Sequence, residues 1–169
     1  TWNRYADFTD GTEIAAGNYT LKATYGNIET QGFEAPYYEG AKEFSIKKNE
    51  STNISVICYL ANVKVTTEYT ELFKKYFTDY TVNIRPAGST DISFGKNETR
   101  AAYVKPGKIS IYLSGSKQQG NKVTFEAATI ENAKARQHYR LKFDVQAGGT
   151  ELDVSFTDET ERVPITIDI

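Results

Sequence analysis

The sequence is poor in the residues that most often carry catalysis and metal binding. Its 169 residues include one cysteine, one histidine, one tryptophan and no methionine. Because Cys58 is the single cysteine, no internal disulfide can form and no Cys-based zinc spacing exists. Glycine-rich phosphate loops, HExxH and GxSxG are absent too, so the usual nucleotide, metalloprotease and hydrolase signatures offer no candidates.

Long apolar runs and concentrated charge are also missing. No apolar stretch approaches the roughly 20 residues that a membrane-spanning helix needs. The formal net charge is −2, and the densest basic groups are the pairs Lys47-Lys48 and Lys74-Lys75. Proteins that bind nucleic acids or anionic membranes usually concentrate Lys and Arg on one surface, so neither is an expected partner. Any targeting segment is expected upstream of Thr1.

Tyrosine and phenylalanine are what the chain has in quantity. Twelve Tyr, nine Phe, 39% hydrophobic and 25% charged residues indicate a globular chain rich in good strand formers. Apolar and polar residues alternate along most of the chain, which is typical of strands with one buried face. The runs occupy 19–25, 44–46, 54–60, 80–84, 109–113, 123–125, 139–145, 152–156 and 163–169. We therefore predict an all-β protein with antiparallel sheets.

One segment departs from this alternation in favour of a helix. Between Leu72 and Phe77 the apolar and aromatic residues recur with helical spacing, and Thr70 is a suitable N-cap. The pattern predicts one short helix near 70–77, packed over one end of a sandwich.

The alternation also shifts by one residue at Ala61-Asn62. A bulge would produce such a shift, and so would a strand that leaves one sandwich and enters another. We adopt the second interpretation and predict two tandem antiparallel β-sandwiches of transthyretin-like or Ig-like design, 1–62 and 63–169. Only about three runs precede the boundary, whereas sheets usually have about four to six strands. We therefore expect further strands of the first sandwich before Thr1 in the parent protein.

The remaining reactive groups are better explained by structure than by catalysis. Cys58 lies on the apolar face of its run and is expected in the core, whereas His138 is expected to point outward, so the two should not meet. The carboxylates that could act in pairs are Asp7, Asp10 and Glu13, and Asp158, Glu159 and Glu161. Both groups fall in polar, turn-like segments without an orienting partner or calcium-loop spacing. We expect no catalytic residue, no metal ligand and no cofactor.

The segment Ala35-Pro36-Tyr37-Tyr38-Glu39-Gly40 is the leading candidate for a contact site. Pro and Gly bracket two tyrosines in what the sequence predicts to be a loop. An exposed tyrosine offers a flat apolar face and a hydroxyl at low entropic cost. Tyr37, Tyr38 and Glu39 are thus candidates to meet a sugar ring or a protein. The alternative is that the tyrosines plug the end of a sandwich.

Several segments resemble a family of surface lipoproteins of unknown function in Bacteroides and its relatives. The resemblance is carried by AGNYTLKA (16–23), APYYEG (35–40), the run 54–65 and FKKYFTDYTV (73–82), and it extends over nearly the whole chain. It implies an exported, lipid-anchored protein of the bacterial outer membrane or cell surface, built like the fimbrillins from two β-sandwiches. It also implies a setting of adhesion and glycan use, and it supplies no catalytic residues.

Three functions remain as hypotheses. The first is a non-catalytic cell-surface module for adhesion or for glycan or protein binding, with Tyr37, Tyr38 and Glu39 as contacts. The second is a structural, fimbrillin-like subunit that assembles by strand exchange, because a sandwich short of strands invites an incoming one. The third and least favoured is a carboxylate-based hydrolase. The expected partner is a surface glycan or another surface or fimbrial protein, with membrane attachment only through an upstream lipid anchor.

Overall fold

The structure is a computed structural model that describes residues 13–145, 152–155 and 159–160. This part of the chain is mostly β, as predicted, and contains one short helix. The elements in chain order are β1 (Gly17–Tyr25), β2 (Gly32–Phe33), β3 (Tyr38–Ile46), β4 (Tyr59–Leu60), β5 (Val63–Tyr69), α1 (Glu71–Tyr76), β6 (Phe77–Pro86), β7 (Ile92–Gly95), β8 (Ala102–Val104), β9 (Gly107–Lys117), β10 (Lys122–Ala133), β11 (Gln137–Val145), β12 (Leu152–Ser155) and β13 (Glu159–Thr160). The predicted run 163–169 lies outside the described residues.

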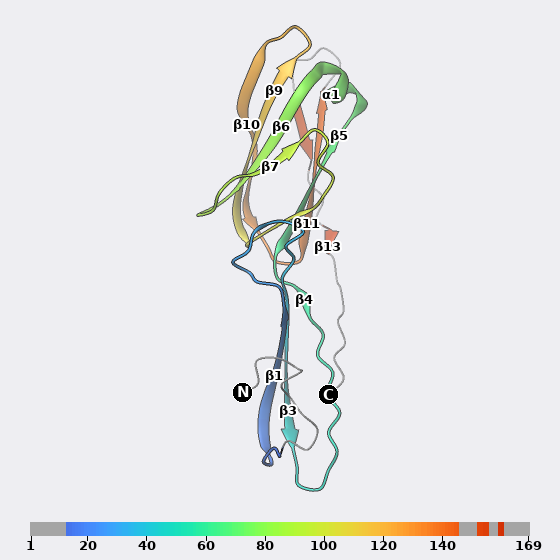
Figure 1. The fold of residues 1–169 in the computed structure, drawn as a ribbon, viewed down its shortest axis with the longest axis vertical. Helices are drawn as coiled ribbons and strands as arrows, with labels where there is room; N and C mark the ends of the chain where they lie inside the picture. Colours follow the sequence, from blue (N-terminus) through green and yellow to red (C-terminus); the bar gives the residue numbers. More distant parts are fainter. Residues whose placement is uncertain (1–12, 146–151, 156–158, 161–169) are drawn as a thin grey trace.

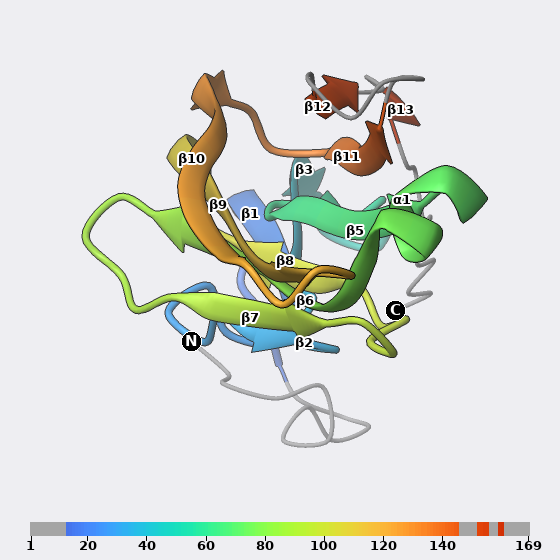
Figure 2. The ribbon, with the colours of Figure 1, turned by 90° about the horizontal axis from the view of Figure 1, so that it is seen from above.

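Most of the strands form a body with a single core. One sheet has the order β10-β9-β6-β7 and the other the order β12-β11-β5-β8-β2, with β13 also paired to β11. Figure 2 shows the elements of both sheets around a common interior. The buried core residues come from both sheets, and Val82, Ile111, Val65 and Leu141 are each 0% exposed. Alternation therefore places the apolar side chains of both sheets in one interior.

One strand pair of the body is parallel. β5 and β11 are paired from His138↔Lys64 to Phe143↔Tyr69 in parallel register. The prediction of purely antiparallel sheets is wrong at this pair. The physical reason is that alternation fixes which face of a strand is buried but carries no information on strand direction.

The helix closes one end of the core, as predicted. Thr70 is its N-cap: its hydroxyl accepts a hydrogen bond from the Phe73 backbone N–H at 3.2 Å and donates one to Asp144 Oδ1 at 2.6 Å. Phe73 is 0% exposed. It packs among the rings of Tyr69, Phe77, Tyr80 and Phe143. The cap thus directs an aromatic side chain into the core.

A narrow arm extends from the body, as Figure 1 shows at β1 and β3. The arm consists of 17–25 and 38–60, and its sheet has the order β1-β3-β4. β1 and β3 are antiparallel neighbours from Gly17↔Ile46 to Tyr25↔Tyr38. The even-numbered residues of 54–60 are buried, as the alternation predicts: Ile54, Val56, Cys58 and Leu60 are 8%, 1%, 2% and 1% exposed. However, only Tyr59–Leu60 of this run forms a strand. The alternating burial therefore extends over more residues than the hydrogen-bonded strand pairing.

The chain passes from the arm to the body at Ala61-Asn62. β4 belongs to the arm sheet and β5 to a body sheet, so the shift in alternation coincides with a change of sheet. Asn62 is 0% exposed, and its carbonyl accepts a hydrogen bond from the Arg136 N–H at 3.0 Å. β2, which precedes the arm's second strand in the sequence, pairs with β8 of the body. The division into domains at this point stays a prediction.

Candidate functional site

The predicted contact residues lie where the arm meets the body. Tyr38 and Glu39 begin β3 and are not in a loop. Tyr37 and Tyr38 are half-buried, whereas Glu39 is exposed. The Tyr37 N–H donates to Asn62 Oδ1, and the Tyr37 carbonyl accepts from the Ala61 N–H at 2.8 Å. These hydrogen bonds hold Tyr37 beside Ala61-Asn62, where the chain passes from the arm to the body.

The three predicted residues point to two faces of the arm. The Tyr37 hydroxyl donates to Glu39 Oε2 at 3.1 Å, so these side chains share one face. Burial raises the pKa of Tyr37, and the nearby Glu39 carboxylate adds to the shift. Tyr38 has the opposite orientation in the strand and lies beside Tyr25, with ring centroids 6.3 Å apart. The three side chains therefore do not form one joint platform, and their role as contacts stays a prediction.

An aromatic–cation contact adjoins the Tyr37 face. Glu39 is paired with Tyr59 in the β3–β4 ladder. The guanidinium carbon of Arg136 lies 3.7 Å from the centroid of the Tyr59 ring. Arg136 comes from the loop between β10 and β11 and has φ 73°, so its backbone is in the left-handed region. This contact joins the arm to the body by side chains as well as by backbone hydrogen bonds.

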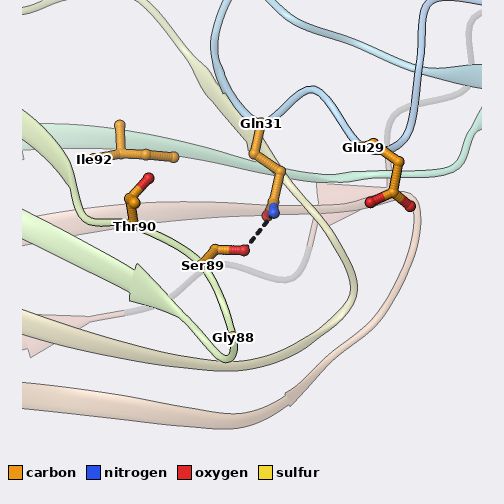
Figure 3. A pocket seen from close by; sticks show the side chains of 6 residues that line it. All are labelled: Glu29, Gln31, Gly88, Ser89, Thr90 and Ile92. Carbon is orange, nitrogen blue, oxygen red and sulfur yellow. Dashed lines mark hydrogen bonds between the residues drawn. The ribbon is translucent and has the colours of Figure 1, made fainter.

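A hollow lies between the β6–β7 turn and the loop before β2. It is a pocket of about 400 Å³ lined by Glu29, Gln31, Gly88, Ser89, Thr90 and Ile92. Figure 3 shows Gln31 pointing across it toward Ser89, with Glu29 at one side and Ile92 at the other. Sequence reasoning missed these residues. A glycine that favours a turn, such as Gly88, does not by itself indicate a pocket.

Hydrogen bonds hold the polar side chains of the pocket in place. Gln31 Nε2 donates to Ser89 Oγ at 2.6 Å, and Gln31 Oε1 accepts from the Lys105 N–H at 2.9 Å. Lys105 also forms an ion pair with Glu29. Gly88 has φ +73°, in the left-handed region that suits glycine in a tight turn. The lining offers hydroxyl, amide and carboxylate groups, which suits hydrogen bonding to a small polar ligand.

The reactive groups singled out in the sequence have separate surroundings. Cys58 is buried, as predicted, with its Sγ 3.6 Å from the Ala23 carbonyl oxygen. Burial raises the pKa of its thiol, which disfavours the thiolate. His138 is half-buried, and its Nε2 lies 2.9 Å from Thr66 Oγ1. Among the described residues, no group of three His, Cys, Asp or Glu side chains lies close enough to hold a metal ion.

Most of the carboxylates considered as pairs lie outside the described residues. Asp7, Asp10, Asp158 and Glu161 lie outside the described residues, and of Glu159 only the backbone is described. Glu13 is exposed at the start of the described chain.

Comparison with models of protein families matches the chain over its whole length. A family model described as Domain of unknown function (DUF4493) covers residues 1–169. No curated protein matches the chain. Within the described ranges, no helix has the length and apolar character to cross a membrane.

Proposed function

The chain belongs to the DUF4493 family, and we propose that it is a non-catalytic module that binds a partner protein by strand pairing along β1. The observation that carries the proposal is the open edge of the arm. β1 pairs with β3 along all nine of its residues, and no second neighbour of β1 exists among the described strands. Such an edge presents backbone N–H and C=O groups to an incoming strand.

The other edges of the described sheets are less suited to this role. β7 and β12 have four residues each, and β2 and β4 have two each, which is short for a docking strand. β10 has twelve residues, but its pairing with β9 shifts at 126–128 and again at 130–133. Bulges of this kind twist an edge and protect it from pairing. β1 is regular throughout and carries one charged residue, Lys22, so it is the least protected edge.

The side chains of the arm favour the same conclusion. Tyr19 and Leu21 of β1 are half-buried, and Tyr19 stacks on Phe44 of β3 with ring centroids 5.8 Å apart. An added strand would lie beside β1 in the plane of the sheet and place its own apolar side chains next to this face. Backbone pairing supplies affinity, and the apolar face supplies selection of the incoming side chains.

We place this module at the bacterial cell surface as an exported, lipid-anchored protein of fimbrillin-like design. The resemblance to surface lipoproteins of Bacteroides supports that location. The arm would then belong to a first sandwich, 1–62, and most of the body to a second sandwich, 63–169, with β2 of the first segment paired to β8 of the second. The same open edge would serve the alternative function, a structural subunit that takes a strand from a second copy.

A photocrosslinking amino acid tests the proposal in cells that make the protein. It is placed at Thr20, which is exposed on β1, and in a matched variant at Ala41, which is exposed on the central strand β3. We expect adducts from position 20 and few from position 41, with the partner identified by mass spectrometry. An adduct to another protein supports the binding module, and an adduct to the same chain supports the structural subunit. Equal yields from both positions, or none from position 20, would refute the proposal.

A further inference from the structure

The outer face of the β10-β9-β6-β7 sheet carries an ordered row of polar side chains. Residues such as Val82 and Leu113 of this sheet point into the core, so their neighbours in sequence point outward. One outward row crosses all four strands, because Glu126 is paired with Tyr112, Tyr112 with Asn83, and Asn83 with Ser93. Paired residues of antiparallel strands lie side by side on one face. At about 4.8 Å between strands, the row spans about 14 Å.

The residue at the centre of this row is a tyrosine whose ring is in contact with an arginine guanidinium. Tyr112 is half-buried, and the guanidinium carbon of Arg85 lies 4.7 Å from the centroid of its ring. Two hydrogen bonds join Arg85 to Asp91, Nε to Oδ1 at 2.6 Å and Nη2 to Oδ2 at 2.8 Å. The Ser93 hydroxyl donates to Asn83 Oδ1 at 2.6 Å. The aromatic ring and the polar groups around it are thus held in place before any ligand arrives.

The chemistry of the row matches a ligand rich in hydroxyl groups. A planar ring packs against the C–H face of a sugar, as apolar ligand surfaces do on aromatic side chains. Because Arg85 lies over one face of the Tyr112 ring, the sugar would pack on the other face. Amide, guanidinium and carboxylate groups offer adjacent donors and acceptors, which pair with neighbouring hydroxyls. Because the face is a row across a sheet, it suits an extended chain of sugars better than a single ring.

The charges of the face favour a neutral ligand. The positive charge of Arg85 is already offset by Asp91 in a bidentate pair. Glu126 adds a carboxylate, and the row from Glu126 to Ser93 contains no lysine. An acidic oligosaccharide would meet the Glu126 carboxylate, and no lysine of this row compensates that charge, which is unfavourable. A neutral oligosaccharide needs no such compensation.

We infer that the outer face formed by Glu126, Tyr112, Asn83, Ser93 and the Arg85–Asp91 pair binds a neutral oligosaccharide. This face is separate from the β1 edge, so the inference goes beyond the protein-binding function proposed for the arm.

The test is an array of neutral oligosaccharides with matched acidic ones, followed by titration calorimetry of each binder. Tyr112→Ala should weaken binding at least about tenfold, as expected for an aromatic contact residue, while Tyr112→Phe should retain most of it. Tyr25→Ala is the matched control, because Tyr25 is 63% exposed on the arm. Asn83→Ala provides a second, milder variant, and circular dichroism checks that each variant is folded.

The outcomes separate this inference from the arm's function. Binding of neutral oligosaccharides that is weakened by Tyr112→Ala and Asn83→Ala, and unchanged by Tyr25→Ala, supports the inference. No binding at millimolar oligosaccharide, a preference for the acidic set, or equal binding by all variants would overturn it. Crosslinking from Thr20 on β1 should be the same in the Tyr112→Ala protein, so failure at one surface does not imply failure at the other.

Discussion

Replacing Gly40 with alanine should loosen the arm and leave the body intact. A Cβ at Gly40 would lie 2.3 Å from the Ile57 carbonyl oxygen, 2.9 Å from the Ile57 carbonyl carbon and 3.1 Å from Cys58 Cα. These are backbone atoms, so no side-chain rotation can relieve the contact. The added methyl group must therefore push 54–60 away from β3. None of the buried residues between Ile54 and Leu60 belongs to the core cluster of the body, so the damage should stay local.

The expected size of the effect follows from the cost of overpacking. Forcing an extra methyl group into a well-packed site costs about 1–3 kcal/mol. At about 1.4 kcal/mol per factor of ten, this corresponds to roughly a 5- to 150-fold increase in the equilibrium constant for local opening. Cys58 reports on that opening, because it is the single cysteine and is 2% exposed. Its labelling rate with a thiol reagent should rise by about the same factor, since opening both exposes the thiol and removes the burial that raises its pKa.

Gly95→Ala is the matched control for this experiment. A Cβ at Gly95 of β7 meets no atom within 4 Å. This substitution should stabilise the protein slightly, by about 0.4–1 kcal/mol, because it restricts the unfolded chain. The labelling rate of Cys58 should not rise. If Gly40→Ala labels Cys58 at the wild-type rate, or if Gly95→Ala accelerates labelling equally, the close approach of 54–60 to β3 is refuted.

Two further predictions concern the stability of the body. Phe73→Ala should lower the free energy of unfolding by about 3–5 kcal/mol in urea, because it removes a fully buried ring, and a loss below about 1 kcal/mol would contradict this. Glu98→Gln should lower the melting temperature at neutral pH only. Arg100 holds the pKa of Glu98 down to about 2 by hydrogen bonding, so the stabilisation is present above the unfolded pKa of about 4.3 and is lost as pH falls toward 2. A melting-temperature difference that persists at pH 2 would argue against the ion pair as its cause.

Burial was the property that the sequence predicted best. The alternation between Ile54 and Leu60 identified the buried side chains even where no strand forms. This is because transfer of apolar groups from water depends on side-chain type and spacing, whereas a ladder needs a partner at the right distance. The helix was also predictable, because its signals are local. The N-cap Thr70 and the apolar residues up to Phe77 lie within about two helical turns of one another.

Pairing partners were the property that the sequence could not predict. Nothing in β5 or β11 indicates that they are parallel neighbours, because that depends on the path of the chain between them. Phe125 shows the same limit, since it lies in the inward register of β10 yet is 39% exposed. It precedes the register shift at 126–128 on the edge strand β10, where a bulge bends the strand. Tyr38 was expected in a loop, because flanking Pro and Gly suggest turns, but its partners in β1 and β4 extend the strand.

Alternation alone does not reveal the side-chain contact on which the inferred glycan-binding face rests. Tyr112 and Arg85 each lie on the polar side of an alternating strand. Taken singly, either residue is typical of a strand face in contact with water. Only the register Asn83↔Tyr112 between β6 and β9 brings them into contact. Backbone groups define the surface proposed on β1, whereas side chains define the surface on β6 and β9. The two surfaces can therefore change independently in evolution, and one chain could hold a protein and a glycan at the same time.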